Sequence, residues 1–227
     1  INYLQIEEEQ KELCDSIFTH DPSLLLNQGA IILNMGKKLR KEEARLHKKF
    51  YDRNNIPIIG EIKENGTVEG GDCLWIDNKT LLVGESYRSN KDGINQLSKI
   101  LSRLNIKCIP IKLTKNNNPN SCFHLMSIIS MLDYDLAIGC LSKIPENMKE
   151  ILKKRNIKLI GISEEEYIKS KTLAVNILAL SPRKLVLING YPKTQKLLLD
   201  EGNELNLFNG SELCIKAEGG PTCLTRA

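Results

Sequence analysis

One thiol, one imidazole and several carboxylates stand in this sequence where they could act together. Cys223 lies in a glycine-rich stretch, Glu-Gly-Gly-Pro-Thr-Cys-Leu-Thr at residues 218–225, whose two glycines let the backbone pass close to a ligand. A reactive cysteine needs a base and a held substrate. His124 can supply the imidazole, and Glu69 and Asp21 can supply carboxylates. Cys223, His124 and Glu69 would form a Cys–His–acid catalytic set, and Asp21 would remain available to hold a cation.

Each of these residues also has a simpler interpretation. A cysteine such as Cys223 is more often buried and structural than reactive. His124 stands between two apolar residues and could belong to the core. Glu69 and Asp72 flank a Gly-Gly pair and could cap a turn, and Asp21 precedes a proline, as turn residues do. Only the placement of all these residues at matching positions of a repeat favours a catalytic role over these simpler interpretations.

The composition narrows the class of protein. With 227 residues and 41% hydrophobic content, the chain can bury a full core, as one large domain or two small ones. The net charge of +4 comes from scattered residues, which argues against nucleic-acid binding. Seven cysteines without a C-x-x-C motif disfavour a disulfide framework or zinc ribbon and favour a reducing, cytoplasmic location. No apolar run approaches the roughly 18 residues of a membrane span, so no membrane partner is expected.

Short apolar runs alternate with amphipathic stretches in units that recur about every 50 residues. Each of four units reads strand, strand, helix, strand, and a fifth begins at Cys223. We expect strands at residues 17–19, 30–33, 56–59, 73–76, 81–83, 108–111, 125–131, 136–138, 158–160, 175–180, 185–188 and 205–207, and helices at residues 41–53, 92–105, 146–155 and 193–200.

Such a period indicates a solenoid or a closed ring. We favour a ring, because closure removes exposed sheet edges, and residues 1–4 read as an orphan strand that could close it. Equivalent positions of successive units then meet at the axis. Asp21, Glu69, His124 and Cys223 all stand near the start of a first strand, whereas the fourth unit offers no candidate. The repeat therefore predicts a site at these strand starts.

Three segments resemble the guanidino-group-modifying enzyme superfamily, which contains arginine deiminases, dimethylarginine dimethylaminohydrolases and amidinotransferases. They are Thr-Val-Glu-Gly-Gly-Asp at residues 67–72, Gly-Glu-Ser-Tyr-Arg-Ser-Asn at 84–90 and Gly-Gly-Pro-Thr-Cys-Leu-Thr at 219–225. The resemblance implies the pentein fold, a five-bladed α/β propeller of ββαβ repeats. It also implies that residues 1–227 form a single catalytic domain whose fifth blade is shared between the chain ends, and that several dozen N-terminal residues are missing.

The resemblance also implies a role for each candidate. Cys223 would be the nucleophile, His124 the general acid and base, and Glu69 the acid that orients His124. Asp21 would hold the guanidinium, while Arg88 and Arg40 would bind the substrate α-carboxylate, a task that suits the bidentate arginine fork. Plain surface charge is an equally good interpretation of Arg40. Asp15 and Asp72, near the starts of units one and two, complete the expected substrate-binding set. No metal or organic cofactor is expected.

One departure leaves the substrate open. Deiminases and amidinotransferases of this superfamily carry His-x-Asp, whereas this sequence reads His124-Leu125-Met126, as in dimethylarginine hydrolases. A thioether beside the guanidinium would leave room for an apolar N-substituent but would equally tolerate plain arginine. We expect a hydrolase that cleaves a C–N bond of free arginine or a methylated arginine, a small-molecule partner. The alternatives are an amidinotransferase and a non-catalytic pentein that only binds. The oligomeric state is open.

Overall fold

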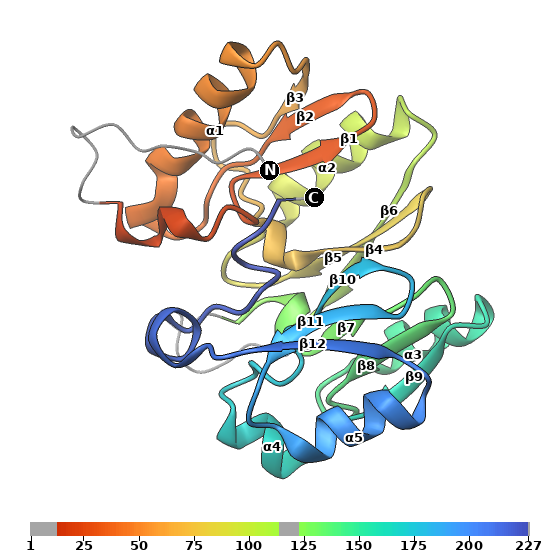
Figure 1. The fold of residues 1–227 in the computed structure, drawn as a ribbon. Helices are drawn as coiled ribbons and strands as arrows, with labels where there is room; N and C mark the ends of the chain where they lie inside the picture. Colours follow the sequence, from red (N-terminus) through yellow and green to blue (C-terminus); the bar gives the residue numbers. More distant parts are fainter. Residues whose placement is uncertain (1–12, 114–122, 227) are drawn as a thin grey trace.

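The computed structural model describes residues 13–113 and 123–226, and it contains four three-stranded sheets (Figure 1). In each sheet the first two strands pair antiparallel as a hairpin, and the third pairs parallel with the second. A helix makes each crossover from the second strand to the third. This order is the ββαβ unit that the sequence predicts.

The strands and crossover helices have the following bounds. The first unit has β1 (Ser23–Leu26), β2 (Gly29–Ile32), α1 (Lys41–Arg53) and β3 (Ile58–Glu61). The second has β4 (Cys73–Asp77), β5 (Thr80–Glu85), α2 (Lys91–Ser102) and β6 (Lys107–Lys112). The third has β7 (Ile129–Met131), β8 (Leu136–Gly139), α3 (Glu146–Lys154) and β9 (Lys158–Gly161). The fourth, after a short helix α4 (Glu164–Lys169), has β10 (Leu178–Ser181), β11 (Lys184–Ile188), α5 (Pro192–Asp200) and β12 (Glu204–Phe208).

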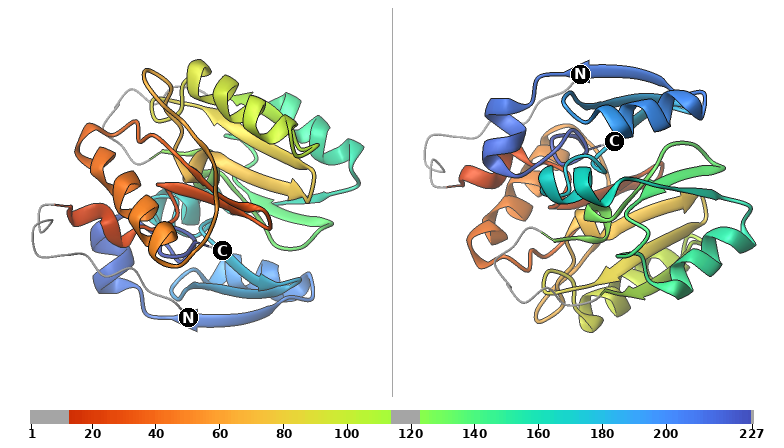
Figure 2. Two further views of the ribbon diagram at one scale, coloured as in Figure 1. Left: turned by 90° about the horizontal axis from the view of Figure 1, so that it is seen from above. Right: turned by 90° about the horizontal axis from the view of Figure 1, so that it is seen from below.

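The second unit shows why these residues form these elements. Helix α2 begins where the Asn90 side chain accepts a hydrogen bond from the N–H of Gly93 at 2.8 Å, an N-cap contact. Ile94, Leu97 and Leu101, spaced for one helix face, are at most 4% exposed and pack in one cluster with β5. The helices therefore lie on the outer side of the sheets, as Figure 2 shows from two directions.

The expected order of elements is confirmed for all four units, and the bounds of helix 41–53 agree with the structure. The strand expected at 17–19 is wrong: residues Cys14–Ile17 form a 3-10 helix, and the first strand begins only after Pro22. The strand expected at Cys223 is also wrong, because residues 221–224 form a turn. Helix α4 has no counterpart among the expected elements.

Ring closure and a fifth blade are not confirmed. Residues 13–113 and 123–226 hold four sheets, and the closing strand expected at residues 1–4 lies outside them. The C-terminal segment nevertheless returns to the first unit: His20 donates its backbone N–H to the carbonyl of Cys223 at 3.2 Å, and the Thr19 hydroxyl donates to that of Leu224 at 3.3 Å. None of the described helices is both long and apolar enough to cross a membrane.

Candidate active site

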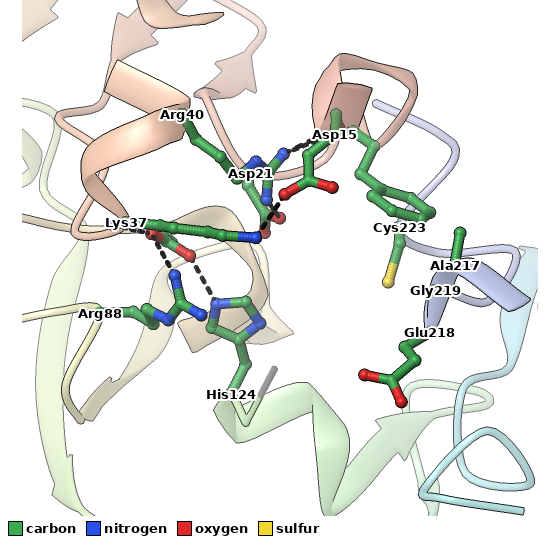
Figure 3. Close-up of a pocket in the computed structure, with 12 residues that line it drawn as sticks. Asp15, Asp21, Lys37, Arg40, Arg88, His124, Ala217, Glu218, Gly219 and Cys223 are labelled. Carbon is green, nitrogen blue, oxygen red and sulfur yellow. Dashed lines mark hydrogen bonds and ion pairs between the residues drawn. The ribbon is translucent and has the colours of Figure 1, made fainter. Parts of the chain in front are cut away.

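One pocket of about 100 Å³ collects most of the side chains that the sequence singled out. Its walls come from the first three units and from the C-terminal segment. Figure 3 shows the Cys223 thiol facing this pocket from one side and His124 and Arg88 from another. It is lined by Asp15, Phe18, Asp21, Lys37, Arg40, Glu69, Arg88, His124, Ala217, Glu218, Gly219 and Cys223. Of the eight expected site residues, only Asp72 does not line it.

His124 is fixed by Glu69. Its Nε2 atom lies 2.8 Å from Oε2 of Glu69, and both side chains are buried. A carboxylate only accepts hydrogen bonds, so Nε2 carries a proton and donates it to Glu69. The ring packs against Gly71, where a Cβ would come within 2.6 Å of Nδ1. Gly71, in the motif at residues 67–72, is therefore needed to seat the imidazole.

Asp21 is a buried carboxylate beside this pair. Its Oδ1 accepts the backbone N–H of Gly71 at 2.9 Å, and its Oδ2 accepts an N–H of Arg40 at 2.6 Å. Burial opposes ionisation, but the charges of His124 and Arg40 outweigh it and hold the pKa of Asp21 well below its usual range. Asp21 thus offers a fixed negative charge to the pocket.

Arg40 is a buried cation of the site, 5% exposed. Besides Asp21, its guanidinium donates to both carboxylate oxygens of Glu43 at 2.7–3.0 Å and to the carbonyl of Phe18 at 3.1 Å. Plain surface charge is therefore the wrong interpretation of Arg40. Contact with a substrate carboxylate would require Arg40 to exchange some of these partners, so that role stays a prediction.

Asp72 lies behind the pocket and supports two of its walls. Its Oδ1 accepts the N–H of Leu125, next to His124, at 2.9 Å. Its Oδ2 accepts the hydroxyls of Ser86 and Ser89, each at 2.7 Å, in the loop that carries Arg88. Burial raises the pKa of Asp72 to about 6, against these hydrogen bonds and the charge of His124. The geometry makes Asp72 a positioning residue.

Arg88 is 6% exposed, and its guanidinium lies 3.8 Å from Oε1 of Glu69. The Ser86 hydroxyl accepts the backbone N–H groups of Arg88 and Ser89, which closes a tight turn at residues 86–89. Arg88 thus reaches the pocket as a cation on the same side as His124 (Figure 3).

Lys37 was missed by sequence reasoning. Its backbone N–H donates to Oε1 of Glu69 at 2.9 Å, and its ammonium group forms a 2.6 Å ion pair with Asp15 (Figure 3). Both side chains of this pair are more than one third exposed, so the pair is weak. A lysine beside another lysine gives no sequence signal for such a contact.

The glycines before Cys223 make room for neighbouring side chains of the protein. A Cβ on Gly219 would come within 2.2 Å of the Phe18 ring, and one on Gly220 within 2.4 Å of the Asn176 carboxamide. Asn176 comes from the fourth unit, which offered no candidate in the sequence. The position of Asn176 within the repeat is a sequence signal for it, because Asn176 precedes β10 by two residues, just as Asp21 precedes β1.

Met126 does not stand where the sequence interpretation placed it. It is half-buried, packs against the hydrophobic core and does not line the pocket. The idea that its thioether makes room for a substituent on the guanidinium is therefore wrong for this structure.

Asp21, Glu69 and His124 also offer ligand atoms within 4.8 Å of one another, the spacing of a possible metal site. A metal ion bound through Nε2 of His124 would have to replace the hydrogen bond of that atom to Glu69. A planar cation such as a guanidinium could instead bind Asp21 and leave that bond intact. That the site works without a metal stays a prediction.

Sequence comparison finds relatives among the arginine deiminases and the dimethylarginine dimethylaminohydrolases. A family model described as arginine deiminase matches residues 8–140, more than half of the chain. The dimethylarginine dimethylaminohydrolase of Pseudomonas aeruginosa is 27% identical over 213 residues, which cover 93% of this chain and 76% of that protein. Arginine deiminase 1 of Staphylococcus epidermidis is 23% identical over 249 residues, covering 92% of this chain but only 60% of the deiminase.

Solved structures agree. A cysteine-to-serine mutant of the P. aeruginosa dimethylarginine dimethylaminohydrolase, complexed with citrulline, matches with a TM-score of 0.78 and 25% identity, covering 95% of this chain and 77% of that one. The N-terminal domain of ArgZ, a cyanobacterial arginine dihydrolase, matches with a TM-score of 0.79 over 94% of this chain and 76% of that one. At 19% identity the second likeness shows the fold alone.

These comparisons confirm the resemblance inferred from the motifs and the α/β fold. The chain therefore belongs to the arginine deiminase family, and its relatives are hydrolases of the arginine deiminase and dimethylarginine dimethylaminohydrolase type.

Proposed function

We propose that the protein hydrolyses a C–N bond in the guanidino group of free arginine or of a methylated arginine, through a covalent intermediate on Cys223. One observation supports this most: a single pocket gathers the Cys223 thiol, the paired His124 and Glu69, and the separate carboxylate of Asp21. A thiol, an oriented imidazole and an anchoring carboxylate are what cysteine-based attack on a cationic carbon requires.

The substrate would bind through its two charged ends. The guanidinium would lie against Asp21, and Asp15 could add a second carboxylate once the cation displaces Lys37 from its weak ion pair. Arg88, and Arg40 if it exchanges partners, would take the α-carboxylate bidentately. Two arginines for one carboxylate favour a free amino acid over a decarboxylated amine such as agmatine.

The reaction would proceed in two steps. The Cys223 thiolate attacks the guanidino carbon, and the C–N bond breaks as its electron pair goes to nitrogen, which takes a proton from His124 and leaves as ammonia or an amine. A thiouronium remains on Cys223. Water then gives a proton to His124 and attacks the same carbon, the C–S bond breaks, and the thiolate returns as the urea-type product leaves. Alternating acid and base duty suits an imidazole.

In the decisive experiment, the full-length protein is incubated with arginine, with methylated arginines, with agmatine, or with arginine and glycine together. Ammonia, methylamines, citrulline and ornithine are then quantified. Citrulline with ammonia or a methylamine supports hydrolysis, and ornithine formed only with glycine would identify an amidinotransferase instead. No turnover of any compound, with no adduct on Cys223 by mass spectrometry, would overturn the enzyme hypothesis and leave the non-catalytic pentein.

Two controls test the mechanism within that assay. A Cys223→Ser variant that kept full activity would contradict the covalent route. EDTA should leave the rate unchanged, because we expect Asp21, Glu69 and His124 to act on substrate without a metal ion. A chelator-sensitive rate that returns on adding zinc would contradict that expectation.

A further inference from the structure

The carboxamide of Asn176 contacts the sulfur of Cys223. Its Nδ2 atom lies 3.2 Å from Sγ, and the side chain is 8% exposed. Its Oδ1 accepts two hydrogen bonds from Thr222, one from the backbone N–H at 3.0 Å and one from the hydroxyl at 2.6 Å. Asn176 therefore holds both the nucleophile and the residue before it.

The chemistry of Thr222 fixes which end of the amide faces the thiol. A backbone N–H can only donate, so the atom of Asn176 that meets it must be the carbonyl oxygen. The NH₂ group is then turned to Cys223, and no flipped amide would satisfy both contacts. An N–H donor thus points at the sulfur atom.

Asn176 is itself held from both sides. The Ser130 hydroxyl, on β7, donates to the carbonyl of Val175 at 2.6 Å and accepts the N–H of Ile177 at 3.5 Å. Gly220 leaves the space that the carboxamide fills. A donor that is fixed before the reaction needs no reorganisation when charge develops near it.

We propose that Asn176 is a catalytic residue of this site, whose N–H group stabilises the Cys223 thiolate and aims its sulfur at the guanidino carbon. The proposal rests on the proposed function for the identity of the carbon under attack. The thiolate carries the negative charge that the amide N–H favours, whereas a neutral thiol gains less from the same donor. Cys223 would thus depend on the third and fourth units as well as on His124.

The test measures alkylation of Cys223, which requires no turnover. The full-length protein reacts with iodoacetamide from pH 5 to 10, and mass spectrometry of the peptide that contains Cys223 separates its rate from those of the other cysteines. Asn176→Leu removes the donor without adding charge, and Asn176→Asp keeps both acceptor contacts to Thr222 but places a carboxylate at the sulfur. Thr222→Val is the matched control, because it removes a hydroxyl from the same network and leaves the donor to Cys223.

We expect the midpoint of the pH–rate profile to rise in both Asn176 variants, more in Asn176→Asp, with alkylation at pH 7 slowed about tenfold, the effect of one hydrogen bond to a charged group. Thr222→Val should keep the wild-type midpoint. Unchanged midpoints in both Asn176 variants would overturn the proposal. If the variants do not fold, the wild-type protein decides: a midpoint no lower than that of a free peptide of residues 219–226 overturns it as well.

These outcomes are separate from those of the proposed function. A midpoint that depends on Asn176 would support the thiolate contact even if no guanidino compound is turned over. Turnover of arginine with unchanged midpoints would support the enzyme and overturn the role of Asn176.

Discussion

Oε2 of Glu69 accepts a hydrogen bond from Nε2 of His124 at 2.8 Å, although the two residues lie 55 positions apart in the chain, in successive units. Oε1 of the same carboxylate accepts the backbone N–H of Lys37 at 2.9 Å. With both oxygens engaged, Glu69 can hold only one orientation, and it fixes the imidazole plane with it. The acid of the proposed set thus acts through His124.

Glu69→Gln should lower kcat about 10²- to 10⁴-fold, because an amide can present its NH₂ group to Nε2 and stabilise the wrong tautomer of His124. KM should change little, since the anchoring carboxylate of Asp21 is untouched. Steady-state kinetics with the best substrate of the panel measures both constants. A large rise in KM at unchanged kcat would contradict this role and point to direct contact between Glu69 and substrate.

Arg40→Ala should lower the free energy of unfolding by about 3–5 kcal/mol, because it leaves the buried carboxylates of Asp21 and Glu43 without their cation. Arg45→Ala, in helix α1 directly after Arg40, is the matched control: its pair with Glu42 is exposed and should contribute at most about 1 kcal/mol. Urea unfolding followed by circular dichroism measures both. Equal losses in the two variants would show that the Arg40 cluster adds no stability beyond that of a surface pair.

The repeat explains how much of this site could be predicted. Asp21, Glu69 and His124 could be found because each precedes the first strand of its unit, and equal positions in a repeat meet in space. Asn176 also precedes the first strand of its unit, by two residues as Asp21 does, but the apolar run at residues 175–180 predicts a strand that contains it.

Other features depend on long-range contacts that no local pattern encodes. Asp72 belongs to the same motif as Glu69, yet it faces away from the pocket because it meets Leu125 and the loop of Arg88. The strand expected at residues 17–19 was misplaced because an apolar run before a proline reads equally well as a strand or as a buried turn. Here Phe18 packs against Gly219, a contact that spans nearly the whole chain.

His47 gives the fold a dependence on pH. It is buried, with Nδ1 3.0 Å from the hydroxyl of Ser23, and burial, helped by the charges of Arg226 and Arg40, lowers its pKa to about 4. Between about pH 6.5 and 4 the unfolded chain binds a proton at this residue and the folded protein does not. Folding stability should therefore fall on acidification, by up to about 1.4 kcal/mol per pH unit from this residue.

His47→Gln tests this contribution by urea unfolding between pH 4.5 and 7.5. The free-energy difference between wild type and variant should shrink as the pH falls, because only wild type loses stability through His47. Lys49→Gln changes an exposed residue on the same helix, so its free energy of unfolding should depend on pH as that of wild type does. Asp72 and His20 titrate in both proteins, so their effects cancel in the comparison. A constant difference across the range would show that His47 does not take part.

Arg226 ties the segment of Cys223 to that of Asp21. Its NH1 group donates to the carbonyl of His20 at 2.8 Å and to that of Ser23 at 2.6 Å, on either side of Asp21 and Pro22. Arg226→Met keeps the apolar stem and removes both donors. We expect the free energy of unfolding to fall by about 1–3 kcal/mol, because the two carbonyls lose a charged partner.

In Arg226→Met the kcat should fall together with the stability, because the Cys223 segment would no longer be held against the first unit. Arg226→Lys keeps a cation that can reach one carbonyl, so its stability and kcat should lie between those of wild type and Arg226→Met. Thermal unfolding and kcat are measured on the same preparations. If Arg226→Met is destabilised but retains wild-type kcat, the contact serves the fold alone, and Cys223 is positioned by Asn176 and its own turn.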